Sequence, residues 1–445
     1  MKKLSFLFAF VAAFTVVASM AMAQESSSVQ LAAFEYYGLD DQASPSDQDV
    51  DDGADVTISD SDCGCDSCCG CDSGCGLGKF GSSCCLGDAW EFYPEDCCGK
   101  KIGGWVQIGY HTRGDKSNAL LRGDGLFNDY PDHVQLQQSW LFVEKSAGGD
   151  SCCWDFGYRA DFVYGTDGQD TQAFGGQPTD WDNDWDHGNF YGSAIPQLYV
   201  EMANCNWRVK AGHFFTIVGY EVVPASGNFF YSKSLSVCLA EPFTHTGVLA
   251  DYSVNDCLTV HGGYTAGWDT GYTEFGGDTY IGGFTYTPDD CSSLAYVATV
   301  GDFGSGPGGS DSNGYSHSIV YSRQLGCNFE YVFQNDHVNN QLFVNNGSAG
   351  LATNLGFVIP AGPTTGHITS YNQYLFHTIN DCLKLGTRLE WMDYGGTEII
   401  ETTFGVNYRP HANVVLRPEV RVYDFEKASG LDDSTIFAVD AIVTF

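Results

Sequence analysis

The sequence predicts an all-β fold, a closed antiparallel transmembrane β-barrel of about sixteen strands, with an N-terminal segment that has no core of its own. Three observations support this prediction. Residues 102–445 repeatedly alternate apolar and polar side chains over stretches of about nine residues, as a strand exposed to different surroundings on its two faces does. These stretches give an even number of strands. The turns on one side are short, whereas the loops on the other side are long.

The chain begins with a segment that is typical of export. Two lysines at positions 2 and 3 precede an apolar run, and Ala21 and Ala23 provide a small-residue cleavage site before Gln24. We therefore expect residues 1–23 to be a cleaved signal peptide. The formal net charge of −36 argues against binding of nucleic acid through electrostatic attraction.

Residues 24–62 differ in composition from the rest of the chain. They are acidic and polar, contain no Lys or Arg, and hold few residues that could form a core. Such a stretch cannot bury enough apolar surface to offset the entropy lost on folding. The sequence therefore predicts a disordered acidic linker here.

Residues 63–101 form a cysteine-rich segment. It contains ten of the eighteen cysteines of the chain, namely Cys63, Cys65, Cys68, Cys69, Cys71, Cys75, Cys84, Cys85, Cys97 and Cys98. In an exported protein we expect such cysteines to form disulfides, whose pairing the sequence does not reveal and which could also link neighbouring chains. The CxC and CxxC spacings also fit a thiolate metal cluster, which stays an alternative.

A regular repeat occupies residues 102–445, the predicted barrel domain. Its units each begin with a short polar turn that carries a cysteine or, once, an asparagine: Cys153, Cys205, Cys257, Cys291, Cys327, Cys382 and Asn413. With the return strands, the predicted strands are residues 104–111, 134–145, 155–164, 195–202, 207–215, 245–254, 258–267, 279–287, 294–301, 315–322, 328–335, 370–379, 383–392, 399–408, 414–424 and 435–445.

The connections between these strands differ in length on the two sides. Residues 255–256, 288–290 and 380–381 are short turns, whereas residues 165–194 and 336–369 are long loops. A soluble β-sandwich has no reason for this asymmetry, which is typical of bacterial outer-membrane barrels with short periplasmic turns and long outer loops. We therefore expect a protein of the outer membrane in contact with its lipid.

The stretch at residues 383–392 illustrates the two faces of a strand. One face carries Leu383, Leu385 and Trp391, and the other carries Lys384 and Arg388. A half-buried strand of a soluble sandwich would alternate in the same way. Within a closed barrel, the apolar face contacts lipid and the charged face lines a watery lumen.

Inward-facing charges give the candidate pore-lining residues. They are Arg159, Asp161, Arg208, Lys210, Glu330, Lys384, Arg388, Glu390, Arg417, Glu419 and Arg421. The basic residues come from strands that should flank the closure of the barrel. They could create a transverse field that sorts solutes. Alternatively, these charges only pair with one another and solvate the wall.

Residues 217–243 are too apolar for an exposed loop. Folded into the barrel they would narrow the lumen; the alternative is packing against the rim or against a neighbouring subunit. The candidate constriction residues are Glu221, Asn228, Phe229, Phe230, Tyr231, Lys233 and Glu241.

Several stretches resemble the "putative β-barrel porin-2" family of bacterial outer membranes. The most specific is GHFFTIVGYEVVPASGNFFYSKSLS followed by EPFTHTGVLADY, and GGWVQIGY and LRPEVRVYDF also fit; the resemblance covers about residues 103–445. The terminal Phe445 resembles the signal by which the barrel-assembly machinery recognises such proteins. The resemblance implies a general diffusion porin that passes small hydrophilic solutes and ions without a cofactor. By analogy it also implies a homotrimer.

A second hypothesis is a structural envelope protein that is cross-linked to its neighbours through the cysteine-rich segment. We expect no enzyme, because the chain contains no GxSxG, HExxH or GxxxxGK[ST] motif and offers no catalytic residues. We also expect no resident metal in the barrel.

Overall fold

The computed structural model describes residues 86–114, 127, 130–148, 153–173, 181–182, 185–187, 190–272, 277–304, 313–340, 367–426 and 432–445. The predicted signal peptide, the acidic linker and the cysteines from Cys63 to Cys85 lie outside the described residues. Among the described residues, no helix is both long enough and apolar enough to cross a membrane.

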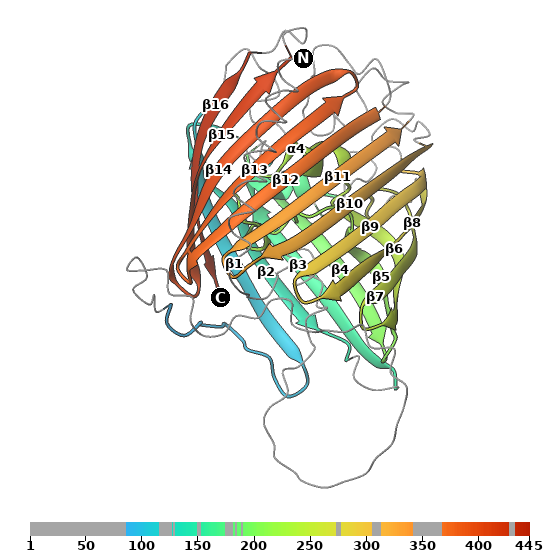
Figure 1. Ribbon diagram of the computed structural model, residues 1–445. Helices are drawn as coiled ribbons and strands as arrows, with labels where there is room; N and C mark the ends of the chain where they lie inside the picture. The colour runs from blue at the N-terminus through green and yellow to red at the C-terminus, as the bar shows by residue number, and fades with distance from the viewer. Residues whose placement is uncertain are drawn as a thin grey trace.

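Sixteen antiparallel strands form one closed barrel (Figure 1). They are β1 (Lys100–His111), β2 (Val134–Lys145), β3 (Asp155–Gly165), β4 (Gly192–Ala203), β5 (Trp207–Phe215), β6 (Thr244–Asn255), β7 (Leu258–Thr265), β8 (Asp278–Asp289), β9 (Ser292–Asp302), β10 (Asn313–Leu325), β11 (Phe329–Asn340), β12 (His367–Asn380), β13 (Leu383–Tyr394), β14 (Thr397–His411), β15 (Val414–Phe425) and β16 (Ser434–Thr444). Each strand pairs with its sequence neighbours, and β16 pairs with β1 from Trp105↔Thr444 to His111↔Ala438. Closure leaves no unpaired sheet edge, as a lipid environment requires.

The predicted strands all occur, and most boundaries agree within a few residues. β1 is longer than predicted because it begins at Lys100, where it pairs with Lys145 of β2. The predicted asymmetry of the loops has one exception. Gly395 and Gly396, both with positive φ, form a two-residue turn between β13 and β14 on the side of the long loops.

The two faces of the wall follow the predicted alternation. Outward-facing apolar side chains are well exposed on the isolated chain: Phe156 is 62%, Val200 is 63% and Phe437 is 60% exposed. Their inward-facing neighbours are buried, and Arg388 and Glu390 of β13 are both 0% exposed. A wall that is apolar outside and charged inside fits a barrel with lipid around it and a polar interior.

Short helices lie in the connections. α3 (Thr166–Thr171) follows β3, whereas the 3₁₀ turn η2 (Ala225–Gly227) and α4 (Leu235–Ala240) both belong to the connection between β5 and β6. α4 contacts β11, β12 and β13, which are distant from β5 and β6 around the barrel. The β5–β6 connection therefore crosses the interior.

Candidate functional site

The segment that crosses the barrel interior, residues 217–243, is called the inner segment below. Its ends are close together, because the Thr216 amide donates to the Phe243 carbonyl at 3.0 Å. The amides of Phe243 and Thr244 also donate to the Asp269 carboxylate, at 2.7 and 2.8 Å. These bonds fix the base of the segment to the outer connection that follows β7.

Arg388 of β13 is the strongest anchor of the inner segment. Its guanidinium donates to Glu221 of the segment at 2.7 Å and to Glu401 of β14 at 2.5 Å. It also donates to the carbonyls of Ser232 and Lys233, at 3.0 and 3.2 Å. A buried guanidinium with two carboxylate partners and further acceptors has the geometry that makes a buried ion pair favourable.

Glu390, two residues further along the same face of β13, holds the start of α4. Its carboxylate accepts from the amides of Leu235 and Ser236, both at 2.7 Å, and from the Ser236 hydroxyl at 3.0 Å. The first amides of a helix have no partner within the helix, so an acidic side chain from the wall satisfies them. Ser234 also caps α4 by accepting from the Val237 amide.

Arg417 of β15 anchors the η2 end of the segment. It donates to the carbonyls of Ala225 and Asn228, at 2.9 and 2.7 Å, and forms an ion pair with Asp440 of β16 at 2.5 Å. Within the segment, the Asn228 side chain accepts from the Val222 amide at 2.9 Å. Asn228 thus shapes the segment and leaves its own carbonyl for Arg417.

The next wall positions on β15 add a further contact. Glu419 accepts from the Ser232 amide at 3.2 Å and forms an ion pair with Arg421 at 3.1 Å. On the other side of the β1–β16 closure, Gln137 of β2 donates to the Tyr231 hydroxyl at 2.8 Å. The segment is therefore held from both sides of the β1–β16 closure.

Missing side chains on the wall accommodate two aromatic rings. Phe229 packs where Gly386 of β13 has no Cβ, and a Cβ on Gly405 of β14 would lie 2.9 Å from the ring of Phe230. The Phe229 ring also lies 4.9 Å from that of Phe376 on β12, centroid to centroid. These glycines allow a close approach of the segment to the wall.

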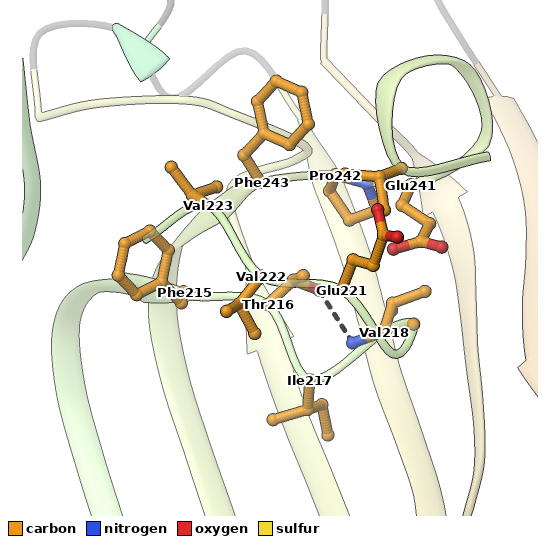
Figure 2. A pocket seen from close by; sticks show the side chains of 12 residues that line it. Phe215, Thr216, Ile217, Val218, Glu221, Val222, Val223, Glu241, Pro242 and Phe243 are labelled. Carbon is orange, nitrogen blue, oxygen red and sulfur yellow. Dashed lines mark hydrogen bonds between the residues drawn. The ribbon is translucent and has the colours of Figure 1, made fainter. Parts of the chain in front are cut away.

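A pocket lies at the root of the inner segment, between its two arms (Figure 2). Figure 2 shows the carboxylates of Glu221 and Glu241 on the same side of this pocket. Gln334 of β11 donates to Glu241 at 2.5 Å. Burial, with the nearby Asp336, raises the pKa of Glu241 well above its usual range. The raised pKa favours the neutral form of Glu241 over a second negative charge beside Glu221.

Arg388 and Arg417 belong to the wall, whereas Lys233 belongs to the inner segment and binds other residues of that segment. Its ammonium donates to the carbonyls of Val222 and Val223 and lies over the ring of Phe127. Burial lowers the pKa of Lys233 to about 8.

Most of the other candidate pore-lining residues form ion pairs along the wall. Arg159 pairs with Asp161 at 2.7 Å and also with Glu144. Arg208 pairs with Glu201 at 2.8 Å, and Lys384 pairs with Glu330 at 2.9 Å. Lys210 is buried and lies over the ring of Tyr199. Paired charges of opposite sign cancel much of each other's electric field, so this pairing lowers the net field across the lumen. It favours the alternative in which the wall charges only pair with one another. The pore-lining role of these residues stays a prediction.

The two described candidate cysteines, Cys97 and Cys98, are exposed, and their sulfurs lie 4.0 Å apart as a weak hydrogen bond and not as a disulfide. The predicted assembly signal Phe445 lies beside β1, where its amide bonds the Gly104 carbonyl at 2.9 Å. Among the described residues, no group of three or more His, Cys, Asp or Glu side chains could hold a metal ion.

The candidate residues predicted from the sequence leave out several residues that hold the inner segment. Glu401 and Asp440 complete the ion pairs of Arg388 and Arg417. Gln138 of β2 accepts from the Ala225 amide at 2.9 Å and donates to the Val223 carbonyl at 3.1 Å. The alternation of β16 puts Asp440 on the inner face, and that of β14 could have placed Glu401 there, but nothing in the sequence identifies Gln138 as an anchor.

Solved bacterial channels have similar folds. An anion-selective porin from Comamonas acidovorans matches with a TM-score of 0.50 and 10% identity, covering 78% of this chain and 99% of that porin. The outer-membrane channel DcaP of Acinetobacter baumannii matches with a TM-score of 0.49 and 12% identity, covering 79% of this chain and 99% of that channel. At these identities the likeness to the porin concerns the fold alone. No curated protein matches the sequence.

The family model described as "Putative beta-barrel porin-2, OmpL-like" matches residues 99–445. This range includes every strand of the barrel and the whole inner segment. The sequence match and the closed sixteen-stranded architecture agree with the resemblance seen in the sequence. The chain belongs to the putative beta-barrel porin-2, OmpL-like family, and its fold is that of an outer-membrane channel.

Proposed function

We propose that this porin forms a water-filled channel through which small hydrophilic solutes and ions diffuse passively, and that the inner segment is its constriction. The observation that carries the proposal is the anchoring of the inner segment to wall residues such as Arg388, Glu390 and Arg417. Held there, the segment narrows the lumen over a defined stretch of the barrel axis.

The chemistry of the inner surface supports passage of polar solutes. The hydroxyls of Ser293 and Ser322 have no hydrogen-bond partner within the described part of the chain, although both are buried. Buried polar groups in proteins are satisfied by protein or by water, and water is the natural partner inside a barrel. Because most inner charges are paired, we expect sieving by size with weak charge selection.

The route to the membrane belongs to the same proposal. We propose export by a signal peptide at residues 1–23, recognition of Phe445 by the barrel-assembly machinery, and an orientation with the short turns in the periplasm. A homotrimer and disulfide links to envelope neighbours are further partners that the resemblance and the cysteine-rich segment suggest.

Uptake of sugars by proteoliposomes tests the channel. Vesicles that contain the refolded mature protein should swell rapidly in small neutral sugars and more slowly as the sugar becomes larger. Impermeability to the smallest sugar, by a protein with the circular dichroism of a β-barrel, would mean that the barrel is plugged. The structural, cross-linking role would then be the better proposal.

A further inference from the structure

The closure between β1 and β16 differs from every other strand pair of the barrel. Each other pair joins strands that follow one another in the sequence, so the chain itself connects them at one end. β1 and β16 have no such connection, because they are the first and the last strand. At the rim of the short turns, the backbones of Gly104 and Phe445 exchange two hydrogen bonds, each of 2.9 Å. Strand ends that no turn joins open most readily, so this end of the closure needs another support.

Residues 86–93, called the strap below, pass across this end of the closure. In Figure 1 the stretch before β1, drawn in blue, runs below the C-terminus and then enters β1. The strap folds back on β1, because the Ile102 amide donates to the Tyr93 carbonyl at 3.2 Å. Glu91 of the strap also forms an ion pair with Lys101 at 3.6 Å. The strap is thus held against β1 by contacts as well as by the chain.

Asn413, in the turn between β14 and β15, attaches the strap to the other side of the closure. Its side chain accepts from the Trp90 amide and donates to the Trp90 carbonyl, both at 2.7 Å. The same side chain donates to the carbonyl of Thr444, the last residue of β16, at 3.0 Å. Beside it, the Ala412 amide donates to the Leu86 carbonyl at 3.0 Å. One amide side chain therefore binds both the strap and the end of β16.

Asn413 is also the exception in the series of short turns. The other six turns carry a cysteine, namely Cys153, Cys205, Cys257, Cys291, Cys327 and Cys382. A primary amide has two N–H donors and a strong acceptor oxygen, whereas a thiol is only a weak donor and a weak acceptor. The turn that departs from the cysteine series is therefore the turn that binds the strap.

Two aromatic rings of the strap pack on Phe445. The ring centroids of Trp90 and Phe92 each lie 6.3 Å from that of Phe445, and the Phe92 pair is edge to face. The Phe445 ring also lies close to Gly104 of β1, where an added Cβ would come within 2.9 Å of it. Phe445 thus contacts both β1 and the strap.

We propose that the strap locks the closure of the barrel at the rim of the short turns. It connects β1 to the end of β16 through Phe445 and Asn413, and so takes the place of the turn that joins every other strand pair. Its binding site combines residues of β1, of β16 and of the β14–β15 turn, so the site exists only after the barrel has closed. The strap therefore binds last. The lock is independent of whether the barrel conducts.

Hydrogen exchange of the full mature chain in lipid vesicles tests the lock at the Gly104 and Phe445 amides. Trp90→Ala/Phe92→Ala should lower the protection of both amides about tenfold or more, because two ring contacts on Phe445 are lost. Asn413→Ala should lower their protection as well, because it removes the side-chain bonds to Trp90 and leaves the backbone of the turn in place.

The matched control is Trp154→Ala/Phe156→Ala. It removes the same two residue types at the same spacing, and both side chains are exposed at the short-turn end of β3, away from the closure. Protection of the Gly104 and Phe445 amides should change less than about twofold in this variant, as expected for an exposed site without contacts to the strap.

Unchanged protection of the Gly104 and Phe445 amides in both strap variants would overturn the lock, and so would an equal loss in the control. A loss of the same size at the Gln324 and Thr378 amides, which lie at short-turn ends of other hairpins, would also overturn it. Such a loss would show general destabilisation and not an opened closure. Heat-modifiable mobility on gels shows whether each variant has closed its barrel. Failure of the strap variants to close, while the control closes, would support the lock.

Discussion

The barrel wall and the inner segment that it encloses are held by different kinds of hydrogen bond. The wall is a continuous backbone ladder from β1 to β16, which any alternating sequence of suitable length could form. The inner segment has only short helical turns and depends on individual side chains of the wall. Single substitutions should therefore disturb the segment much more than the wall.

The largest loss of stability is expected at Arg388, whose side chain binds both the wall and the inner segment. Arg388→Ala leaves Glu221 and Glu401 buried without their cation, which costs roughly 3–5 kcal/mol. Urea unfolding of the protein in lipid vesicles measures this loss. Leu385→Ala, on the outer face of the same strand, is the matched control and should cost about 1 kcal/mol or less. Equal losses would show that the inner anchors are no more important than the lipid-facing wall.

The base of the inner segment should depend on pH through Asp269, which lies outside the strands. Burial raises the pKa of Asp269 from 3.8 to about 6, so the folded protein binds a proton that the opened state releases in this range. The resulting stability is present below pH 4 and is lost as the pH rises through 6, up to about 3 kcal/mol. Hydrogen-exchange protection of the Phe243 and Thr244 amides should fall accordingly.

Asp269→Asn is the control for this pH dependence. An amide does not titrate in this range, so the protection factors of the same two amides should become independent of pH. A wild-type protein whose protection rose between pH 4 and 7 would show that the ionised Asp269 holds the base more firmly, contrary to this account.

A smaller effect separates the two carboxyl groups of the pocket. Glu221→Gln removes one of the charged partners of Arg388 and should cost about 1–3 kcal/mol. Glu241→Gln should cost less than about 1 kcal/mol, because the raised pKa of Glu241 favours a neutral carboxyl, which the amide resembles. Denaturant midpoints of the two variants provide the comparison. A larger loss for Glu241→Gln would mean that Glu241 is ionised in the folded protein.

The barrel wall could be predicted from the sequence because side chains in a strand alternate between its two faces, so apolar and polar residues repeat with a period of two. Alternation with period two, turn residues and strand length together indicated all sixteen strands. The two-residue turn at Gly395 and Gly396 was the exception to the predicted asymmetry of the loops. Alternation within two strands indicates the strands but does not determine the length of the loop between them. The inner segment was noticed because apolar residues such as Phe229 and Phe230 do not suit an exposed loop.

The contacts of the inner segment could not be predicted in the same way. Arg417 meets the Asn228 carbonyl across a sequence separation of 189 residues, and no local pattern records such a contact. Glu401 was missed because β14 carries two acids, Glu398 and Glu401, and the sequence alone does not show which of them meets Arg388 across the β13–β14 hairpin. The role of Gly386 and Gly405 could not be predicted either. They make room for the rings of Phe229 and Phe230, which lie far away in the sequence.

The central claim is that the inner segment narrows an open, water-filled pore. Single-channel conductance in planar bilayers tests it most directly, comparing the mature protein with a variant in which residues 220–241 are replaced by a short Gly-Ser linker. The account predicts discrete conductance steps for the wild type and clearly larger steps for the variant. Steps of equal size, or a wild type that conducts no current while its barrel is verified by circular dichroism, would contradict it.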